Sequence, residues 1–127
     1  NGDGNVDLIV CNSRDATIAL LTGVGDGSFN APKTTSLGTP NTSLPYQIAI
    51  GDINGDGRPD VVSAIYADQQ IGITYNANGL FGTTTKLAAS GFPRGVAVGD
   101  LNGDGTTDIV SANSTDGSIS IILNKSK

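Results

Sequence analysis

The 127-residue chain lacks four residue types altogether, namely Glu, His, Met and Trp. Without His, the sequence offers no Ser–His or Cys–His pair for nucleophilic catalysis. Gly, Ser, Thr, Asn and Asp are abundant instead, and this composition disfavours long helices. We therefore expect a chain that is not an enzyme and whose secondary structure is not helical.

Basic residues and long apolar runs are also scarce. Only seven Lys and Arg residues are scattered along a chain of net charge −5, whereas a nucleic-acid surface needs clustered basic residues. No apolar run approaches the roughly 18 to 20 residues that cross a bilayer, and no basic amphipathic helix is visible. These absences argue against a nucleic-acid partner and against membrane insertion.

The chain has one cysteine, Cys11, at the end of the apolar run LIVC. A free cysteine of this kind is most often a small buried side chain. The alternatives are an intermolecular disulfide or a reactive thiol. We expect a buried thiol.

The sequence repeats itself three times. The segments DLIVCNSRDATIALL, DVVSAIYADQQIGITY and DIVSANSTDGSISIIL begin at Asp7, Asp60 and Asp108, which are 53 and 48 residues apart. LPYQIAIGD and FPRGVAVGD precede the second and third copies and also match each other. Internal repeats of this length are typical of repeat architectures.

Each repeat contains four candidate strands bounded by turn residues. They are an alternating strand (Gln47 to Gly51, Gly95 to Gly99), an apolar strand after each repeated Asp, a third around Ile18, Ile71 or Ile119, and a fourth after Phe29 or Phe81. The pattern predicts an all-β fold of propeller-like, four-stranded blades, with a solenoid of stacked hairpins as the alternative.

The predicted organisation is about two and a half repeats, in units of residues 1–52, 53–100 and 101–127, of which the first and last are partial. Ten strands of this kind do not close a ring. We expect a continuing chain or neighbouring copies to supply the missing strands at the sheet edges.

The loop between the first two strands reads D-x-N-x-D-G-x-x-D. In the second repeat its oxygen donors are Asp52, Asn54, Asp56, the carbonyl of Arg58, and Asp60, with Gly57 at the turn. Oxygens from alternate residues of a tight loop are typical ligands for calcium. The third repeat has the same set in Asp100, Asn102, Asp104, Thr106 and Asp108, and the first has Asn1, Asp3, Asn5 and Asp7 without the leading acid.

The alternative interpretation is that these loops are only turns, because Asp, Asn and Gly all favour turns. Three copies in phase, which contain eight of the twelve aspartates, favour calcium sites, since such carboxylates repel one another without a cation. A further recurring aspartate, present as Asp15, Asp68 and Asp116, follows each apolar strand. We assign it to a turn in preference to a second metal site, because no other acid lies nearby.

The repeats resemble FG-GAP repeats of the VCBS type, which occur in integrin α-chain propellers and in many secreted microbial proteins. The resemblance is carried by PYQIAIGDINGDGRPDVV, PRGVAVGDLNGDGTTDIV and NGDGNVDLIV, with the glycine-rich GVGDGSF and NANGLF. It implies a propeller, commonly of seven blades, with calcium bound between the first two strands of a blade.

The function expected from these features is that of an extracellular, calcium-binding structural or adhesive module. It would be a protomer of an end-to-end assembly or fibre, or part of a longer propeller. The expected partners are other copies or a continuing chain, with glycans or cell-surface proteins as further partners. The alternative is a lectin-like module that stacks sugars on Tyr46, Tyr66 and Tyr75, although packing is the more common role of such aromatics.

Three N-x-S/T sequons begin at Asn41, Asn113 and Asn124. This short pattern also arises by chance in a chain rich in Asn, Ser and Thr. Together with calcium loops, which millimolar extracellular calcium would fill, the sequons predict a secreted glycoprotein.

Overall fold

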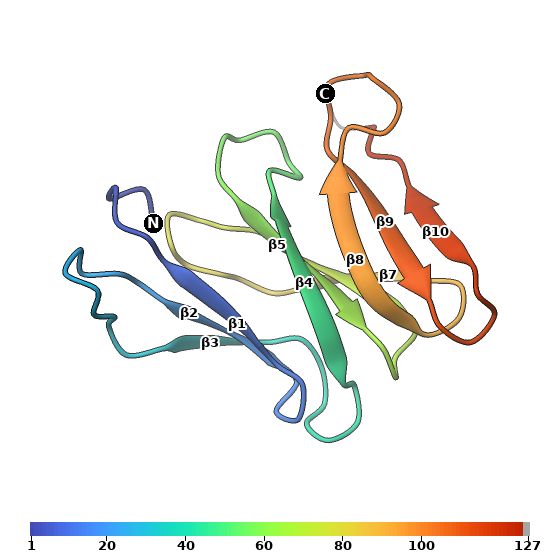
Figure 1. Cartoon of the computed structure of the whole chain (residues 1–127), viewed down its shortest axis with the longest axis horizontal. Coiled ribbons are helices and arrows are strands. Elements are labelled where there is room, and N and C mark those ends of the chain that lie inside the picture. Colours follow the sequence, from blue (N-terminus) through green and yellow to red (C-terminus); the bar gives the residue numbers. More distant parts are fainter. Residues whose placement is uncertain (126–127) are drawn as a thin grey trace.

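The computed structural model describes residues 1–125 as an all-β fold without helices (Figure 1). That part of the chain therefore contains no helix long and apolar enough to cross a membrane. The strands are β1 (Leu8–Asn12), β2 (Thr17–Leu21), β3 (Lys33–Ser36), β4 (Pro45–Gly51), β5 (Asp60–Ile65), β6 (Gln70–Thr74), β7 (Thr85–Ala88), β8 (Pro93–Gly99), β9 (Asp108–Asn113) and β10 (Ile119–Ile122).

The ten strands form three antiparallel sheets of consecutive strands. Sheet 1 has the order β1-β2-β3, sheet 2 the order β4-β5-β6-β7, and sheet 3 the order β8-β9-β10. Figure 1 shows the three sheets side by side, in the order of the sequence. Sheet 2 is a complete four-stranded blade, and the other two are three-stranded, so the all-β, propeller-like prediction without a closed ring is confirmed.

Sheets 2 and 3 each include the strand before their acidic loop as well as the strand after it. Gly51 pairs with Asp60 across one loop, and Gly99 pairs with Asp108 across the next. The predicted unit limits at residues 52 and 100 therefore lie inside sheets 2 and 3. The structural repeats run instead from β4 to β7 and from β8 onward.

Two apolar layers hold the sheets together. Val62, Ala64 and Ile71 of sheet 2 pack against Val96 and Ile109 of sheet 3. On the opposite face of sheet 2, Val61 and Ile65 pack against Ile18 of sheet 1. Both faces of β5 are thus covered, which explains why all six of its residues are buried and why four of the five residues after its first aspartate are apolar.

The turn after each apolar strand has a recurring left-handed residue. Asp15, Asp68 and Asp116 all lie in these turns, as predicted. The next residue has a positive φ in every copy: Ala16 at 52°, Gln69 at 55° and Gly117 at 66°. Only the third copy has glycine, the residue that adopts this conformation without strain.

Replacing Ile71 by Ala should destabilise the protein strongly, because Ile71 is fully buried between sheets 2 and 3. We expect a loss of about 2–5 kcal/mol in the free energy of unfolding, measured by urea denaturation. Leu80→Ala is the control, since Leu80 is an exposed loop residue and should change stability by less than about 0.5 kcal/mol. Equal effects of the two variants would contradict the packing described.

Gln69→Gly should stabilise the protein. The substitution relieves about 1–2 kcal/mol of left-handed strain, against about 0.5–1 kcal/mol for the greater chain entropy that glycine loses on folding. The net gain expected in urea denaturation is about 0.5–1 kcal/mol. Gly117→Gln, the reverse change at the equivalent turn, should lower stability by a similar amount.

Candidate metal centre

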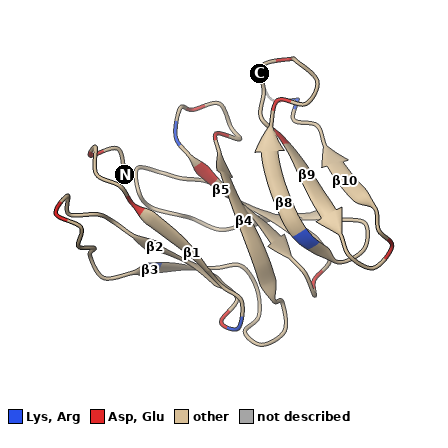
Figure 2. Ribbon diagram, viewed as in Figure 1, with Lys and Arg blue, Asp and Glu red and all other residues tan. Residues whose placement is uncertain are grey.

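Three acidic loops lie at one end of the sheets. We call them loop 1 (residues 1–7, before β1), loop 2 (52–60, between β4 and β5) and loop 3 (100–108, between β8 and β9). Figure 1 shows all three at the same end of their strands, and Figure 2 shows acidic segments in each of them. The predicted ligand residues are therefore gathered in three separate clusters, one for each sheet.

The first acid of loop 2 holds the loop in a curled form. The Asp52 carboxylate accepts hydrogen bonds from the backbone N–H groups of Gly55 (2.8 Å), Asp56 (3.1 Å) and Gly57 (2.8 Å). Loop 3 repeats this arrangement, in which Asp100 accepts from Gly103, Asp104 and Gly105. The carboxylate at position one is therefore fixed at the centre of each complete loop.

Two glycines in each loop permit this curl. Gly57, the predicted turn residue, has φ of +81°, and its counterpart Gly105 has +84°. Gly55 and Gly103 at position four are also left-handed, at +75° and +77°. This second glycine requirement was not predicted from the sequence, although the repeated N-G-D-G contains its signal.

The acids at position five have the same partners in all three loops. In loop 2 the Asn54 side chain donates to Asp56 Oδ2 at 2.8 Å, and the N–H of Arg58 donates to Asp56 Oδ1 at 2.9 Å. The matching pairs are Asn1 and Asn5 around Asp3, and Asn102 and Thr106 around Asp104. Loops 1 to 3 thus share one local structure although positions seven and eight differ in sequence.

These contacts favour the ionised form of the acids. For Asp56, desolvation raises the pKa, but the hydrogen bonds from Asn54 and Arg58 and the charge of Arg58 outweigh it and lower the pKa below its usual value. The pKa of Asp3 is lowered mainly by the backbone hydrogen bond from Asn5. Both carboxylates therefore remain negatively charged at neutral pH.

The closing acid has a role in the sheet that the sequence did not reveal. Asp60 is fully buried and accepts from the N–H of Ile53 in its own loop (3.0 Å) and from the N–H of Asn76 after β6 (2.8 Å). Asp108 makes the same two bonds to Leu101 and Asn124. Each closing carboxylate therefore ties its loop to the segment that follows the third strand of the same sheet.

In loop 1 the closing acid keeps one of these bonds. Asp7 Oδ1 accepts from the N–H of Gly23, which follows β2 at the same sixteen-residue separation. Its second oxygen contacts the amino group of Asn1 at 2.8 Å. The spacing from acid to partner is thus constant through the three repeats and could have been read from the sequence.

Asn124, which follows β10, bridges loops 2 and 3. The side-chain nitrogen of Asn124 donates to the carbonyl of Ile53 in loop 2 (2.6 Å) and to that of Thr107 in loop 3 (3.3 Å). A cavity of about 120 Å³ lies between the two loops. The Asn124 side chain therefore links sheet 3 to sheet 2, and the backbone N–H of the same residue donates to the buried closing acid Asp108.

The chemistry of the loops is that of oxygen donors. Each complete loop offers the carboxylates of positions one and five, the amide oxygen of position three and the carbonyl of position seven, and these groups suit a hard cation such as calcium. Across residues 1–125, no three carboxylate or thiol side chains converge closely enough to hold a metal by themselves. A calcium ion in one of these loops would therefore need the amide and carbonyl oxygens as ligands in addition to the carboxylates.

The sequence was compared with known protein families. A family model described as FG-GAP-like repeat matches residues 1–63 and 52–111. The chain belongs to the FG-GAP-like repeat family. The two matches overlap across loop 2, so this family's repeat includes the acidic loops. No curated protein and no solved structure matches the chain significantly.

Two of the three predicted sugar-stacking tyrosines pack together in this FG-GAP-like protein. The rings of Tyr46 and Tyr66 have centroids 5.1 Å apart, and Tyr66 also packs on Phe92 at 5.0 Å. The Arg94 guanidinium lies 5.1 Å from the Tyr66 centroid and 5.4 Å from that of Tyr46. Tyr75 is not part of this group and lies with Ile53 and Ile122 around another hollow.

The sequons differ in their surroundings. Asn41 is exposed in a turn. The Asn113 side chain is buried and donates to the hydroxyls of Ser118 and Ser120, so a glycan there would have to displace it from the sheet. The side chain of Asn124 is engaged between the loops, and its sequon extends to residue 126, which lies outside the described residues.

Cys11 is half-buried at the interface of sheets 1 and 2, as a structural thiol would be. It packs against the apolar layer between these sheets, and its Sγ lies 3.6 Å from the carbonyl oxygen of Pro45. Burial raises the pKa of the thiol, which lowers the thiolate fraction at neutral pH.

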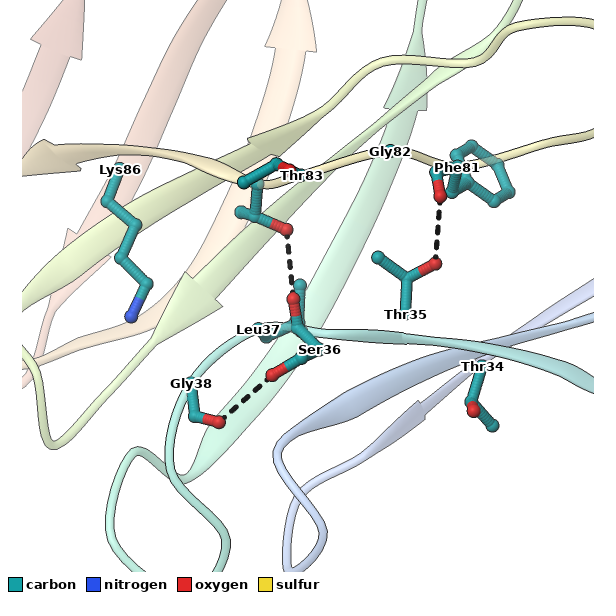
Figure 3. A pocket seen from close by; sticks show the side chains of 10 residues that line it. Thr34, Thr35, Ser36, Leu37, Gly38, Phe81, Gly82, Thr83 and Lys86 are labelled. Atoms are coloured by element: carbon teal, nitrogen blue, oxygen red, sulfur yellow. Dashed lines mark hydrogen bonds between the residues drawn. The ribbon is translucent and has the colours of Figure 1, made fainter.

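A hollow of about 570 Å³ lies between sheets 1 and 2, and half of the ten residues that line it carry hydroxyl groups (Figure 3). Thr35 donates to the carbonyl of Phe81, and Thr84 donates to that of Ser36. These bonds join β3 of sheet 1 to the segment that precedes β7 of sheet 2, so the hydroxyls have a structural role there.

Asp60→Asn should destabilise the protein even without metal, because one of the two backbone N–H donors would then face an amide NH₂ group. We expect a loss of about 1–3 kcal/mol in urea denaturation with a chelator present. Asp15→Asn, at an exposed turn, is the control and should change stability by less than about 0.5 kcal/mol. An unaffected Asp60→Asn variant would contradict the structural role of this carboxylate.

Proposed function

We propose that this FG-GAP-like chain is an extracellular structural module of the adhesive type, whose loops bind calcium. The observation that carries the proposal is the shared geometry of loops 2 and 3. In both, the acid at position one is held by three backbone N–H groups and the acid at position five accepts from its Asn neighbour. Turn formation accounts for backbone bonds of this kind, and the oxygen donors on alternate residues of both loops are the feature that suits calcium.

Calcium in loop 2 would be held by Asp52, Asn54 and Asp56 with the carbonyl of Arg58, and Asp60 would close the site. Loop 3 would use Asp100, Asn102, Asp104, the Thr106 carbonyl and Asp108. Loop 1 would use Asn1, Asp3, Asn5 and Asp7 at the corresponding positions. The ion would supply positive charge and fixed geometry, with no reaction to catalyse.

The charge distribution supports the same proposal. Eight of the twelve aspartates lie in the three loops, while the chain has only seven basic residues and a net charge of −5. Arg58 offsets part of the charge of loop 2 through its ion pair with Asp56. Calcium would remove the remaining repulsion among carboxylates at this end of the sheets.

Calcium binding would also stabilise the packing of the sheets. The closing acids Asp60 and Asp108 bond to the segments after β6 and β10, and Asn124 links loop 3 to loop 2. A loop fixed by an ion would therefore keep these bonds in place. The described residues thus favour a role for calcium in stability.

The extracellular location is part of the proposal. Calcium sites of moderate affinity fill at the millimolar concentrations found outside cells. Asn41 is the sequon best placed for a glycan because it is exposed in a turn. We expect the partners to be further FG-GAP-like repeats, with cell-surface proteins or glycans as the molecules that such a module would contact.

Calcium should raise the melting temperature of the chain. At about one hundred times its dissociation constant, a ligand adds about 2.7 kcal/mol per site, which corresponds to an increase of roughly 10 °C for a chain of this size. Differential scanning calorimetry with calcium, with magnesium and with a chelator would measure the effect. Magnesium should act more weakly, because it requires a smaller octahedral site.

The double variant Asp56→Asn, Asp104→Asn tests whether the loops carry the effect. It should retain most of the stability seen in chelator and lose more than half of the calcium-induced increase. The control Asp15→Asn, Asp26→Asn removes the same charge outside the loops and should keep the full increase. The proposal would be refuted if calcium left the melting temperature unchanged, or if both double variants lost the calcium-induced increase equally.

A further inference from the structure

Loop 2 contains a basic side chain at a position where the other two loops have a neutral one. Position seven is Arg58 in loop 2, Asn5 in loop 1 and Thr106 in loop 3. The proposed calcium site uses the backbone carbonyl of this residue and leaves its side chain without a role. Figure 2 shows a basic segment beside the acidic ones in the loop between β4 and β5.

The Arg58 guanidinium is held at two points. Its Nη2 lies 2.5 Å from Oδ2 of Asp56, the acid at position five, and its Nε donates to the carbonyl of Asn76 at 2.9 Å. Asn76 follows β6, and its own N–H donates to the closing acid Asp60. The guanidinium therefore bridges one proposed calcium ligand to the segment that holds another.

The ion pair uses the same carboxylate as the proposed calcium site. Asp56 Oδ1 accepts from the backbone N–H of Arg58, and Oδ2 accepts from both the Asn54 amide and the Arg58 guanidinium. A guanidinium and a calcium ion are both attracted to such a carboxylate and repel each other. An ion in loop 2 would therefore have to displace the guanidinium or bind beside a like charge.

Loop 3 shows that the bridge does not need a charged side chain. There the hydroxyl of Thr106 lies 2.5 Å from a carboxylate oxygen of Asp104 and 2.9 Å from the carbonyl oxygen of Asn124, the repeat equivalent of Asn76. A neutral hydroxyl thus contacts the two groups that correspond to those held by Arg58. The positive charge at position seven is therefore additional to the structural role of the side chain.

We propose that Arg58 is a built-in counter-ion of loop 2, which stabilises the loop without calcium and raises the calcium concentration at which the loop fills. The inference rests on the proposed calcium site and adds a residue that sets its affinity. Without the ion, the guanidinium offsets the charge of Asp56 and so reduces the repulsion between Asp56 and Asp52. The same charge opposes the approach of a doubly positive ion.

Arg58→Thr should tighten calcium binding by loop 2. The substitution provides the hydroxyl that Thr106 uses in loop 3, and it removes the competing charge. We expect a roughly tenfold decrease in the calcium concentration at which loop 2 is half filled, equivalent to about 1.4 kcal/mol.

Two glycine amides report on the loops separately. The N–H of Gly57 donates to Asp52 in loop 2, and that of Gly105 donates to Asp100 in loop 3. Their resonances in a nitrogen–proton correlation spectrum, followed during a calcium titration of the full chain, would give one midpoint for each loop. In Arg58→Thr the Gly57 midpoint should fall roughly tenfold, while the Gly105 midpoint should stay the same.

Two further variants separate charge from shape. Arg58→Lys keeps the positive charge without the planar guanidinium, so its Gly57 midpoint should stay close to that of the unmodified chain. Arg14→Thr removes the same charge from the turn between β1 and β2, where Arg14 donates to Asn41, and should leave both midpoints unchanged. Correlation spectra in chelator would check that each variant retains the fold.

Failure of this inference and failure of the proposed calcium sites give different results. If neither Gly57 nor Gly105 responds to calcium, the proposed function is overturned and the role of Arg58 with it. If both glycines respond but the Gly57 midpoint is the same in Arg58→Thr as in the unmodified chain, the inference alone is overturned. An equal gain in affinity in Arg58→Lys and Arg58→Thr would also overturn it, because the charge would then have no effect.

Discussion

The structure depends on a buried carboxylate at the end of each acidic loop. Asp60 has no exposed surface, and its two oxygens are used by one N–H from its own loop and one from the segment after β6. A buried charge requires such partners, because its desolvation is otherwise too costly. The loop, the second strand and the end of the third strand are therefore fixed together, and the same constraint acts at Asp108.

This constraint connects the local loop structure to the packing of the sheets. The segment bonded by Asp108 includes Asn124, whose side chain reaches the carbonyl of Ile53 in the neighbouring loop. Along the strands, one apolar layer joins sheet 2 to sheet 1 and a second apolar layer joins sheet 2 to sheet 3. Polar bonds at the loop end and apolar packing along the strands thus hold adjacent sheets in one arrangement.

Equivalent apolar positions of two repeats can be buried in one sheet and exposed in another. Equivalent strand positions of sheets 2 and 3 carry almost the same residues, yet Ile71 is buried and Ile119 is exposed. A pattern of apolar residues predicts a face that prefers to be covered, and neighbouring structure decides whether it is. The same distinction applies to the tyrosines, since Tyr46 and Tyr66 are twenty residues apart in sequence and meet only because β4 and the turn after β5 are adjacent.

The sequence by itself determined the all-β fold, the ten strands and the position of the acidic loops, because alternation, turn residues and repeat spacing are local properties. It also determined that the loops carry oxygen donors in phase, as the N-G-D-G segments show. Only the tertiary structure decided that Asp60 and Asp108 are buried, that Asn113 is bonded to Ser118 and Ser120, and that Asn124 links two loops. These contacts join atoms from different strands or sheets, so they exist only once the chain has brought those segments together.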